Sequence, residues 1–124
     1  MSLNKSLETG MQHQLAGRHS QAAAIYLEIL KSEPSQPDAN NLLGLLRMEQ
    51  ERDEEAVLLM EKALALYATA ARFHHNIAGL YPRMGRLGEA EARFREAIRL
   101  KADYGEAYQG LAEMIKFKAG EPLS

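Results

Sequence analysis

The stretch GRLGEAEARFREAIRL, residues 85–100, has two counterparts earlier in the chain at a constant distance. ERDEEAVLLMEKALAL stands 34 residues earlier at 51–66, and GRHSQAAAIYLEILKS stands another 34 residues earlier at 17–32. The residue types that recur in register are Arg18, Arg52 and Arg86, and Ala22, Ala56 and Ala90. A spacing that persists while most residues change indicates an internal structural repeat.

Each of these three stretches carries the pattern of an amphipathic helix. In 85–100 the apolar residues recur at spacings of three and four, which places them on one face of a helix. They are Leu87, Ala90, Phe94, Ala97, Ile98 and Leu100. Residues 54–66 and 20–31 show the same pattern. The alternation of apolar and polar residues that is typical of strands does not appear, so we expect an all-helical chain.

A second set of helices is predicted around these stretches. The segments that carry it are 3–16, 37–50, 71–84 and 104–118. Pro37 is well tolerated at a first helical position, whereas Gly10 weakens its helix by about 1 kcal/mol. Seven helices that alternate with short turns are therefore expected.

Small residues recur where the two helices of each pair would cross. On the second helices they are Ala22, Ala56 and Ala90, and on the first helices they are Gly10, Gly44, Ala78 and Ala112. The bulky residues that would fill the gap beside each contact are Tyr26, Met60 and Phe94. A bundle of unrelated amphipathic helices is the alternative, but such a bundle has no need for a constant period.

In these positions the chain resembles the tetratricopeptide repeat family, whose 34-residue unit is a helix–turn–helix. The third repeat matches through Ile77, Ala78, Tyr81, Gly85, Ala90, Phe94, Ala97 and Leu100. The second matches through Leu43, Gly44, Ala56, Met60, Ala63 and Leu66, and the first through Gly10, Gly17, Ala22, Tyr26, Leu30 and Pro34. Residues 105–119 match the first helix of a fourth unit through Ala107, Tyr108, Leu111, Ala112 and Ile115.

Four positions depart from the family pattern. Arg47 and His13 stand where an aromatic residue is usual in the first helix, and Ala68 and Ala102 stand where Pro34 ends its own repeat. These departures loosen the packing locally but leave the register intact.

The resemblance implies an all-α fold, a right-handed α-solenoid of antiparallel helix pairs that forms one domain over residues 1–124. Its parts are repeats at about 3–36, 37–70 and 71–104, a capping helix at about 105–118 and a tail at 119–124. We expect the last helix to end near Gly120, because Pro122 prevents its continuation.

Pro82 lies inside the predicted helix 71–84 and cannot donate a hydrogen bond to the carbonyl of Ala78. We therefore predict a kink at Pro82 that opens a local pocket beside Gly79. The alternative is that the helix ends near Tyr81.

Several classes of function are excluded by composition. The chain has no cysteine, so disulfides and thiolate metal sites are ruled out, and no apolar run approaches the roughly 18 residues of a membrane span. A net charge of −2 argues against nucleic acid. His74 and His75 point about 100° apart on a helix and do not form a metal pair. We expect a cytoplasmic protein that is not an enzyme and needs no cofactor or metal.

The resemblance places the first helices on a concave surface that binds extended peptides or partner helices. Carried onto this sequence, the groove would consist of Asp38, Asn41, Leu45, Met48, Glu49, Arg72, His75, Asn76, Gly79, Arg83, Gln109, Glu113 and Lys116. Residues 37–70 contain three basic and seven acidic side chains, whereas residues 71–104 contain seven basic and four acidic ones. The third repeat is therefore the basic part of the predicted groove.

Arg72 and Arg83 are eleven residues apart, about 16 Å along a helix, with His75 between them. This stripe predicts an acidic or carboxylate-bearing segment as the ligand, because arginines suit carboxylates. The alternative is a solvated face, or pairing with acidic neighbours such as Glu49. The carboxylate clamp of some family members uses lysines and asparagines from successive repeats, and here only Asn76 stands at such a place.

The function predicted from these features is a scaffold or adaptor that binds a protein or peptide segment. One alternative is an interaction arm of a larger transferase, of the sulfotransferase or glycosyltransferase kind, because 104–124 looks like the exit from repeat arrays that precede such domains. Another is a structural scaffold that associates with itself as a homo-oligomer.

Overall fold

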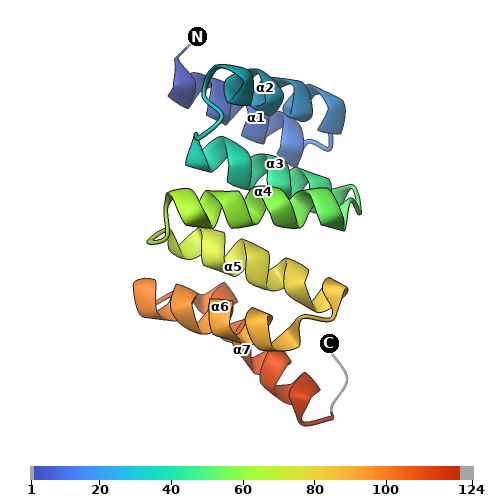
Figure 1. The fold of residues 1–124 in the computed structure, drawn as a ribbon, viewed down its shortest axis with the longest axis vertical. Helices are drawn as coiled ribbons and strands as arrows, with labels where there is room; N and C mark the ends of the chain where they lie inside the picture. Colours follow the sequence, from blue (N-terminus) through green and yellow to red (C-terminus); the bar gives the residue numbers. More distant parts are fainter. Residues whose placement is uncertain (1, 121–124) are drawn as a thin grey trace. The chain divides into compact units, whose positions relative to one another are not determined.

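The computed structural model describes residues 2–120, and within that range all regular structure is helical (Figure 1). The α-helices are α1 (Leu3–Leu15), α2 (His19–Ser32), α3 (Pro37–Glu49), α4 (Asp53–Leu66), α5 (Ala71–Leu80), α6 (Leu87–Leu100) and α7 (Gly105–Lys118). A short 3-10 helix, η1 (Tyr81–Met84), follows α5. The predictions of an all-α chain and of seven helices are confirmed for the described residues. Pro122 and most of the predicted tail lie outside them.

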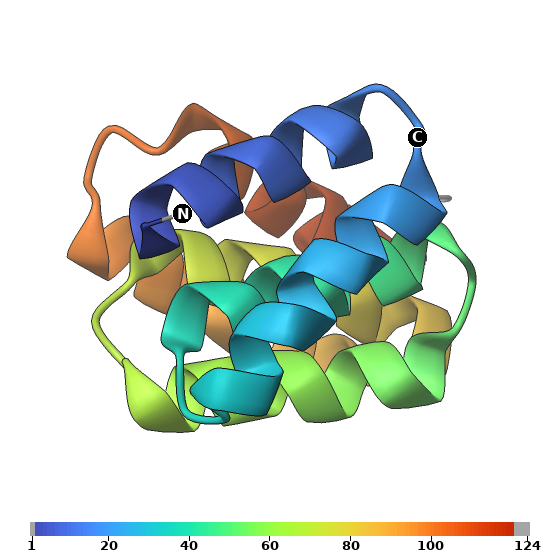
Figure 2. The same ribbon diagram turned by 90° about the horizontal axis from the view of Figure 1, so that it is seen from above.

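The chain divides between Tyr67 and Ala68 into two compact units. The N-terminal unit contains the helix pairs α1–α2 and α3–α4, and α2 also packs on α3. The C-terminal unit contains the pair α5–α6, with η1 and α7 packed against α6. Figure 2 shows α1 and α2 running in opposite directions, as the short turn between them requires.

The turns that precede α2, α4 and α6 explain the arginines in register. Arg18, Arg52 and Arg86 are the residues that immediately precede these three helices. Arg52 donates to Glu55 at 2.7 Å, and Arg86 contacts Glu89 at 2.7 Å, three residues into the helix in each case. Arg18 instead donates to His13 Nδ1 at 2.7 Å. The side chain therefore ties the turn to a neighbouring residue in all three pairs.

The residue just before each of these arginines has a positive φ angle. The angles are 77° at Gly17, 61° at Glu51 and 74° at Gly85. Glycine adopts this left-handed conformation without steric cost, whereas a residue with a Cβ atom does so at about 1–2 kcal/mol. The turn geometry is thus the same in all three repeats, and Glu51 is strained where the other two repeats have glycine.

The predicted helix crossings are present in the structure. Ala22, Ala56 and Ala90 are fully buried. A Cβ atom at Gly10 would lie 2.5 Å from the Tyr26 ring, and one at Gly44 would lie 2.7 Å from Met60 Cγ. These pairs of a small and a bulky residue therefore set how closely the two helices of a repeat approach.

Ala112 does not occupy such a crossing, contrary to the prediction, because it is exposed. No second helix of a fourth repeat packs on α7 in the part of the chain that the structure describes. The close contact of α7 is made instead by Gly110, where a Cβ atom would overlap the Phe94 ring.

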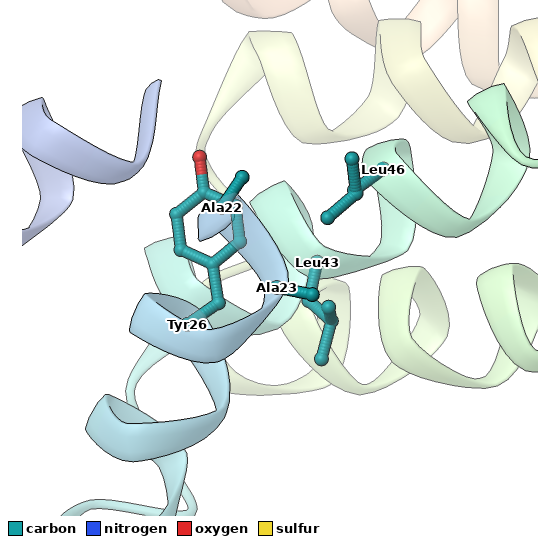
Figure 3. Packing of buried hydrophobic residues seen from close by; sticks show 5 residues of the cluster. All are labelled: Ala22, Ala23, Tyr26, Leu43 and Leu46. Carbon is teal, nitrogen blue, oxygen red and sulfur yellow. The ribbon is translucent and has the colours of Figure 1, made fainter. Parts of the chain in front are cut away.

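One continuous cluster fills the N-terminal unit between α2 and α3. Figure 3 shows Ala22, Ala23 and Tyr26 of α2 beside Leu43 and Leu46 of α3. Tyr26 and Leu46 are fully buried. Burial of aromatic and leucine side chains of this size stabilises the fold by about 1.5–3 kcal/mol each.

The segment 71–84 differs from the predicted kinked helix. The α-helix ends at Leu80, and Tyr81–Met84 continues as a 3-10 turn that closes at Gly85. Pro82 has no amide hydrogen to continue the α-helical hydrogen bonds, so the α-helix ends two residues before it, at Leu80, rather than bending. Tyr81 is buried, and the guanidinium of Arg86 lies 4.5 Å from the centre of its ring.

Candidate functional site

The C-terminal unit has an open hollow of about 710 Å³ between α5–η1 and α7. Five predicted groove residues line it, namely Gly79, Arg83, Gln109, Glu113 and Lys116. Phe94, Ala78 and Met114 are buried residues that also line it and form its apolar floor. The pocket predicted beside Gly79 is therefore present, although the end of α5 rather than a kink creates it.

The walls of this hollow combine open space with charge. A Cβ atom at Gly79 would meet nothing within 4 Å, so this side of the hollow is unobstructed. Arg83 and Lys116 are exposed cations on opposite walls, and Glu113 is the acidic group beside them. An apolar floor with a few charged groups at the rim is the usual composition of a ligand site.

Arg72 and His75 do not line this hollow. The His75 ring instead lies between two aromatic rings, with centroids 5.8 Å from Phe94 and 5.0 Å from Tyr104. Its Nε2 atom is 3.5 Å from a carboxylate oxygen of Glu106. The Arg72 guanidinium lies 5.0 Å from the centre of the Phe73 ring. The stripe predicted from Arg72 to Arg83 is thus divided within α5: Gly79 and Arg83 line the hollow, whereas His75 lies beside Tyr104 and Glu106 at the start of α7.

Burial lowers the pKa of His75, and the nearby Glu106 carboxylate partly opposes this shift. The Nδ1 atom of His75 is buried and has no hydrogen-bond partner among the described residues. His75 is therefore a neutral, partly buried ring under ordinary conditions. Asn76, the next residue, is partly exposed.

The N-terminal unit has a smaller hollow of about 140 Å³, between α1 and α3. Leu45 and Glu49 are the predicted groove residues that line it. The other lining residues are Met11, Gln14, Leu15 and Leu42. The surface is mostly apolar, and its size admits a single side chain rather than a peptide segment.

A chain of polar contacts closes one side of this smaller hollow. The Tyr26 hydroxyl donates to Gln14 Oε1 at 2.8 Å, and Gln14 Nε2 donates to Glu49 Oε1 at 3.0 Å. His19 Nε2 lies 3.6 Å from the other oxygen of Glu49. Burial, with a smaller contribution from the Glu49 charge, raises the pKa of Tyr26 to about 12. The polar groups of this hollow are therefore already paired with one another.

The remaining predicted groove residues belong to α3 and do not line either hollow. Asp38 and Met48 are partly buried, and both interact with other parts of the protein. Asn41 is 2% exposed, and its Oδ1 atom has no hydrogen-bond partner within the described range.

The adjacent histidines have separate environments. His74 is buried, with Nε2 2.7 Å from the carbonyl oxygen of Ala68 and Nδ1 3.1 Å from Arg93. Burial lowers its pKa, and the Ala68 carbonyl opposes this shift. No cluster of three potential metal-binding side chains occurs among residues 2–120. Within the same range, no helix combines the length and apolarity needed to span a bilayer.

Sequence reasoning missed the residues that surround the predicted ones. Tyr104 and Glu106 hold His75, and Gln14 connects Tyr26 to Glu49. For Tyr104 and Glu106 a usable signal existed, because the turn before α7 must return beside the start of α5. The sequence contained no such signal for Gln14, because a glutamine on a helix is normally exposed to solvent.

Two family models together match almost the whole repeat region of the chain. A family model described as a tetratricopeptide repeat matches residues 10–71, and a second one of the same description matches residues 71–104. Superkiller complex protein 3 of Mus musculus is 30% identical over 107 residues, which cover 86% of this chain and 7% of that protein. The chain thus spans a small fraction of the length of this curated relative.

Several solved structures have a similar fold. A mutant O-GlcNAc transferase of Thermobaculum terrenum has a TM-score of 0.88 at 24% identity, covering 92% of this chain and 22% of the other. The first repeat domain of Spaghetti (RPAP3), bound to the HSP90 peptide SRMEEVD, has a TM-score of 0.85 at 17% identity. That likeness covers 92% of this chain and 90% of the other. At these identities the likeness establishes the fold.

Proposed function

The chain belongs to the tetratricopeptide repeat family, and on that premise we propose that it is a protein-binding scaffold whose C-terminal hollow binds an acidic peptide segment. Repeats of this family are typically non-catalytic interaction modules, and we propose the same for this chain. We place this binding in the cytoplasm, in keeping with a sequence that has no cysteine.

The single observation that carries the proposal is the open hollow of about 710 Å³ that Gly79, Arg83, Gln109, Glu113 and Lys116 line together. It offers an apolar floor for one or two side chains and two cations for a carboxylate. The α1–α3 hollow of the N-terminal unit, which predicted groove residues also line, is five times smaller than this one. We therefore assign peptide binding to the C-terminal hollow.

Charge favours an acidic ligand over a basic one. The hollow contains the cations Arg83 and Lys116 against the single acid Glu113, and residues 71–104 have seven basic and four acidic side chains. The peptide SRMEEVD, which the Spaghetti domain binds, carries three acidic residues and one basic residue. It is a suitable first probe for this chain, although the two domains share only 17% identity.

The experiment is fluorescence polarisation with labelled SRMEEVD and with the analogue SRMQQVN, in which uncharged amides replace the three carboxylate side chains. Exposed ion pairs contribute only about 0–1 kcal/mol each, so we expect weak binding of the acidic peptide that weakens further with added salt. The double variant Arg83→Glu with Lys116→Glu should lower the affinity at least about tenfold, which corresponds to about 1.4 kcal/mol.

The matched control is Lys5→Glu, which reverses the charge of an exposed lysine in the N-terminal unit. This variant should bind as the parent does, and circular dichroism should show the same helical content in all variants. Equal affinity of the parent and of the double variant, or equal affinity for the acidic peptide and its amide analogue, would refute the proposal.

A further inference from the structure

A second hollow of the N-terminal unit lies away from the predicted groove, between α1 and α2. Its volume is about 420 Å³, and it has an apolar centre formed by Leu3, Ile25 and Ile29. Leu3 is 37% exposed, and both isoleucines are partly exposed. Three apolar side chains gathered in one open groove are a surface that a partner would cover.

The rim of this α1–α2 groove consists of short polar side chains and two acidic ones. Ser6, Thr9 and Ser32 line it with short side chains, so a helix can approach closely. Glu28 and Glu33 also line it. Both carboxylates are exposed, and neither makes an ion pair with any other residue that the structure describes. The groove therefore favours an apolar ligand that carries positive charge.

The chain itself has an uncovered apolar ridge on α7. Tyr108 and Ile115 are each 48% exposed, Ala112 is exposed between them, and Leu111 is half-buried at the edge. The spacing of four and three residues places the first three on one helix face. Ala107 and Met114 lie on the other face and are buried. One face of α7 thus packs on the rest of its unit, and the apolar ridge lies on a different face that stays exposed.

The charge beside this ridge is positive. Lys116 follows Ile115, is exposed, and has no ion-pair partner within the described range. At the other end, the Tyr108 hydroxyl donates to the carbonyl of Ala102 at 2.9 Å, which holds the ring over the turn that begins at Lys101. The ammonium group of Lys101 is 4.9 Å from the centre of the Tyr104 ring and makes no salt bridge in this part of the chain.

The groove and the ridge also match in length. From Tyr108 to Ile115 the ridge spans seven residues, or about 10.5 Å of helix. The wall of the groove from Ile25 to Ser32 also spans seven residues, and the opposite wall from Leu3 to Thr9 spans six, or about 9 Å. The apolar ridge flanked by lysines thus matches the apolar groove lined by glutamates in length and is opposite to it in charge.

We propose that the α1–α2 groove of one copy binds the α7 ridge of a second copy of this chain. Such a contact is heterologous, because two different surfaces meet, so each copy in an assembly can use its groove and its ridge at once. Ile115 and Tyr108 enter the apolar centre, Ala112 lies against the short side chains, and the lysines approach Glu28 and Glu33. The contact is smaller than the roughly 800 Å² per partner of a standard interface, so association is weak and strengthens at low salt.

The test is sedimentation equilibrium of the chain from about 10 µM to about 1 mM, a range suited to weak association. We expect the average mass to rise with concentration above the 13.8 kDa of one chain. Ile115→Glu should block the ridge and Ser32→Arg the groove, and each should weaken association at least about tenfold. Matched controls carry the same changes off these surfaces, namely Phe117→Glu on the other flank of α7 and Ser20→Arg at the start of α2. They should associate as the parent does.

Mixing the two blocked variants separates this contact from any symmetric one. The Ile115→Glu chain keeps an intact groove and the Ser32→Arg chain keeps an intact ridge, so the mixture should form a one-to-one complex and grow no further. Three results would overturn the proposal: a parent that stays monomeric at every concentration, a Ser32→Arg chain that associates with itself as the parent does, or a mixture that forms no complex. Circular dichroism spectra that match the parent establish that the exposed substitutions leave the fold intact.

Discussion

The α1–α3 hollow of the N-terminal unit and the hollow of the C-terminal unit both lie between first helices of neighbouring repeats, but they differ in size and in the side chains that line them. In the first, of about 140 Å³, Gln14 and Glu49 bond to each other and to Tyr26. In the second, of about 710 Å³, Arg83 and Lys116 stand at the rim of an apolar floor. The repeat thus places a hollow between first helices in both units, and the lining side chains set its size and charge.

Helix crossings show the opposite behaviour, because both units satisfy the same packing demand. Ala56 in the N-terminal unit and Ala90 in the C-terminal unit are fully buried at equivalent places. Each stands one turn before a bulky side chain, Met60 in one unit and Phe94 in the other. The two units thus share the packing of their helix pairs.

The largest expected effect is overpacking of this shared framework. Ala56→Leu and Ala90→Leu should each lower the free energy of unfolding by about 1–3 kcal/mol, because a buried alanine leaves no room for three more carbon atoms. Thermal and urea unfolding would measure the loss. Ala65→Leu and Ala92→Leu are matched controls on the exposed faces of α4 and α6 and should be nearly neutral. A loss confined to one unit would show that the two frameworks are not equivalent.

The next effect is expected at alkaline pH, from Tyr26 in the N-terminal unit. The pKa of Tyr26 is raised to about 12 by burial and by Glu49, above the value of about 10 in an unfolded chain. Its contribution is therefore complete below about pH 10 and is lost as the pH rises toward about 12, by roughly 2 kcal/mol in total. Urea unfolding at a series of pH values would show this loss in the parent and a shallower one in Tyr26→Phe.

A smaller effect is expected at the strained turn of the N-terminal unit. Glu51 has a φ angle of 61°, where the equivalent residue of the C-terminal unit is Gly85. Glu51→Gly should raise the free energy of unfolding by about 1 kcal/mol, because the left-handed conformation costs about that much for a residue with a Cβ atom. The reciprocal change Gly85→Ala should lower it by a similar amount. Urea unfolding that shows no gain for Glu51→Gly would mean that the turn is not strained.

The smallest effect on the free energy of unfolding is expected when the pH is lowered, and it comes from His74 in the C-terminal unit. Burial lowers the pKa of His74 below that of a histidine in an unfolded chain. The stability that His74 contributes is thus present above the ordinary value of about 6.5 and is lost as the pH falls below it toward the folded value. Urea unfolding between about pH 7 and pH 5 should show a steeper decline for the parent than for His74→Gln, and equal slopes would contradict the account.

The sequence was sufficient to predict the parts of the fold that repeat, namely the helices and the crossings between them. The apolar spacing predicted all seven helices, and the register of Ala22, Ala56 and Ala90 predicted the crossings, because packing at a crossing depends on size alone. Ala112 was the exception, since its role requires a further helix that does not pack on α7 in the described residues. The end of α5 at Leu80 was only the alternative expectation, because the effect of Pro82 on a helix depends on the turn that follows it.

The candidate site was predicted less completely, for a different physical reason. Five of the predicted groove residues line the C-terminal hollow, since they face one side of two neighbouring first helices. Arg72 and His75 lie outside it, nearer the start of α5, and their part in a groove stays a prediction. Partners such as Gln14 and Tyr104 act through contacts between helices distant in sequence, and spacing within one helix contains no information about these contacts.

The most direct test of the central claim is an NMR titration of the isotopically labelled chain with the acidic peptide SRMEEVD. The account predicts that the amide signals of Gly79, Arg83 and Lys116 shift with added peptide, and that those of Leu45 and Glu49 in the smaller hollow do not. The amide analogue SRMQQVN, which lacks the three carboxylate side chains, should produce weaker shifts at the same places. Shifts centred on the smaller hollow, or no shifts at the larger one at millimolar peptide, would contradict the assignment of binding to the C-terminal unit.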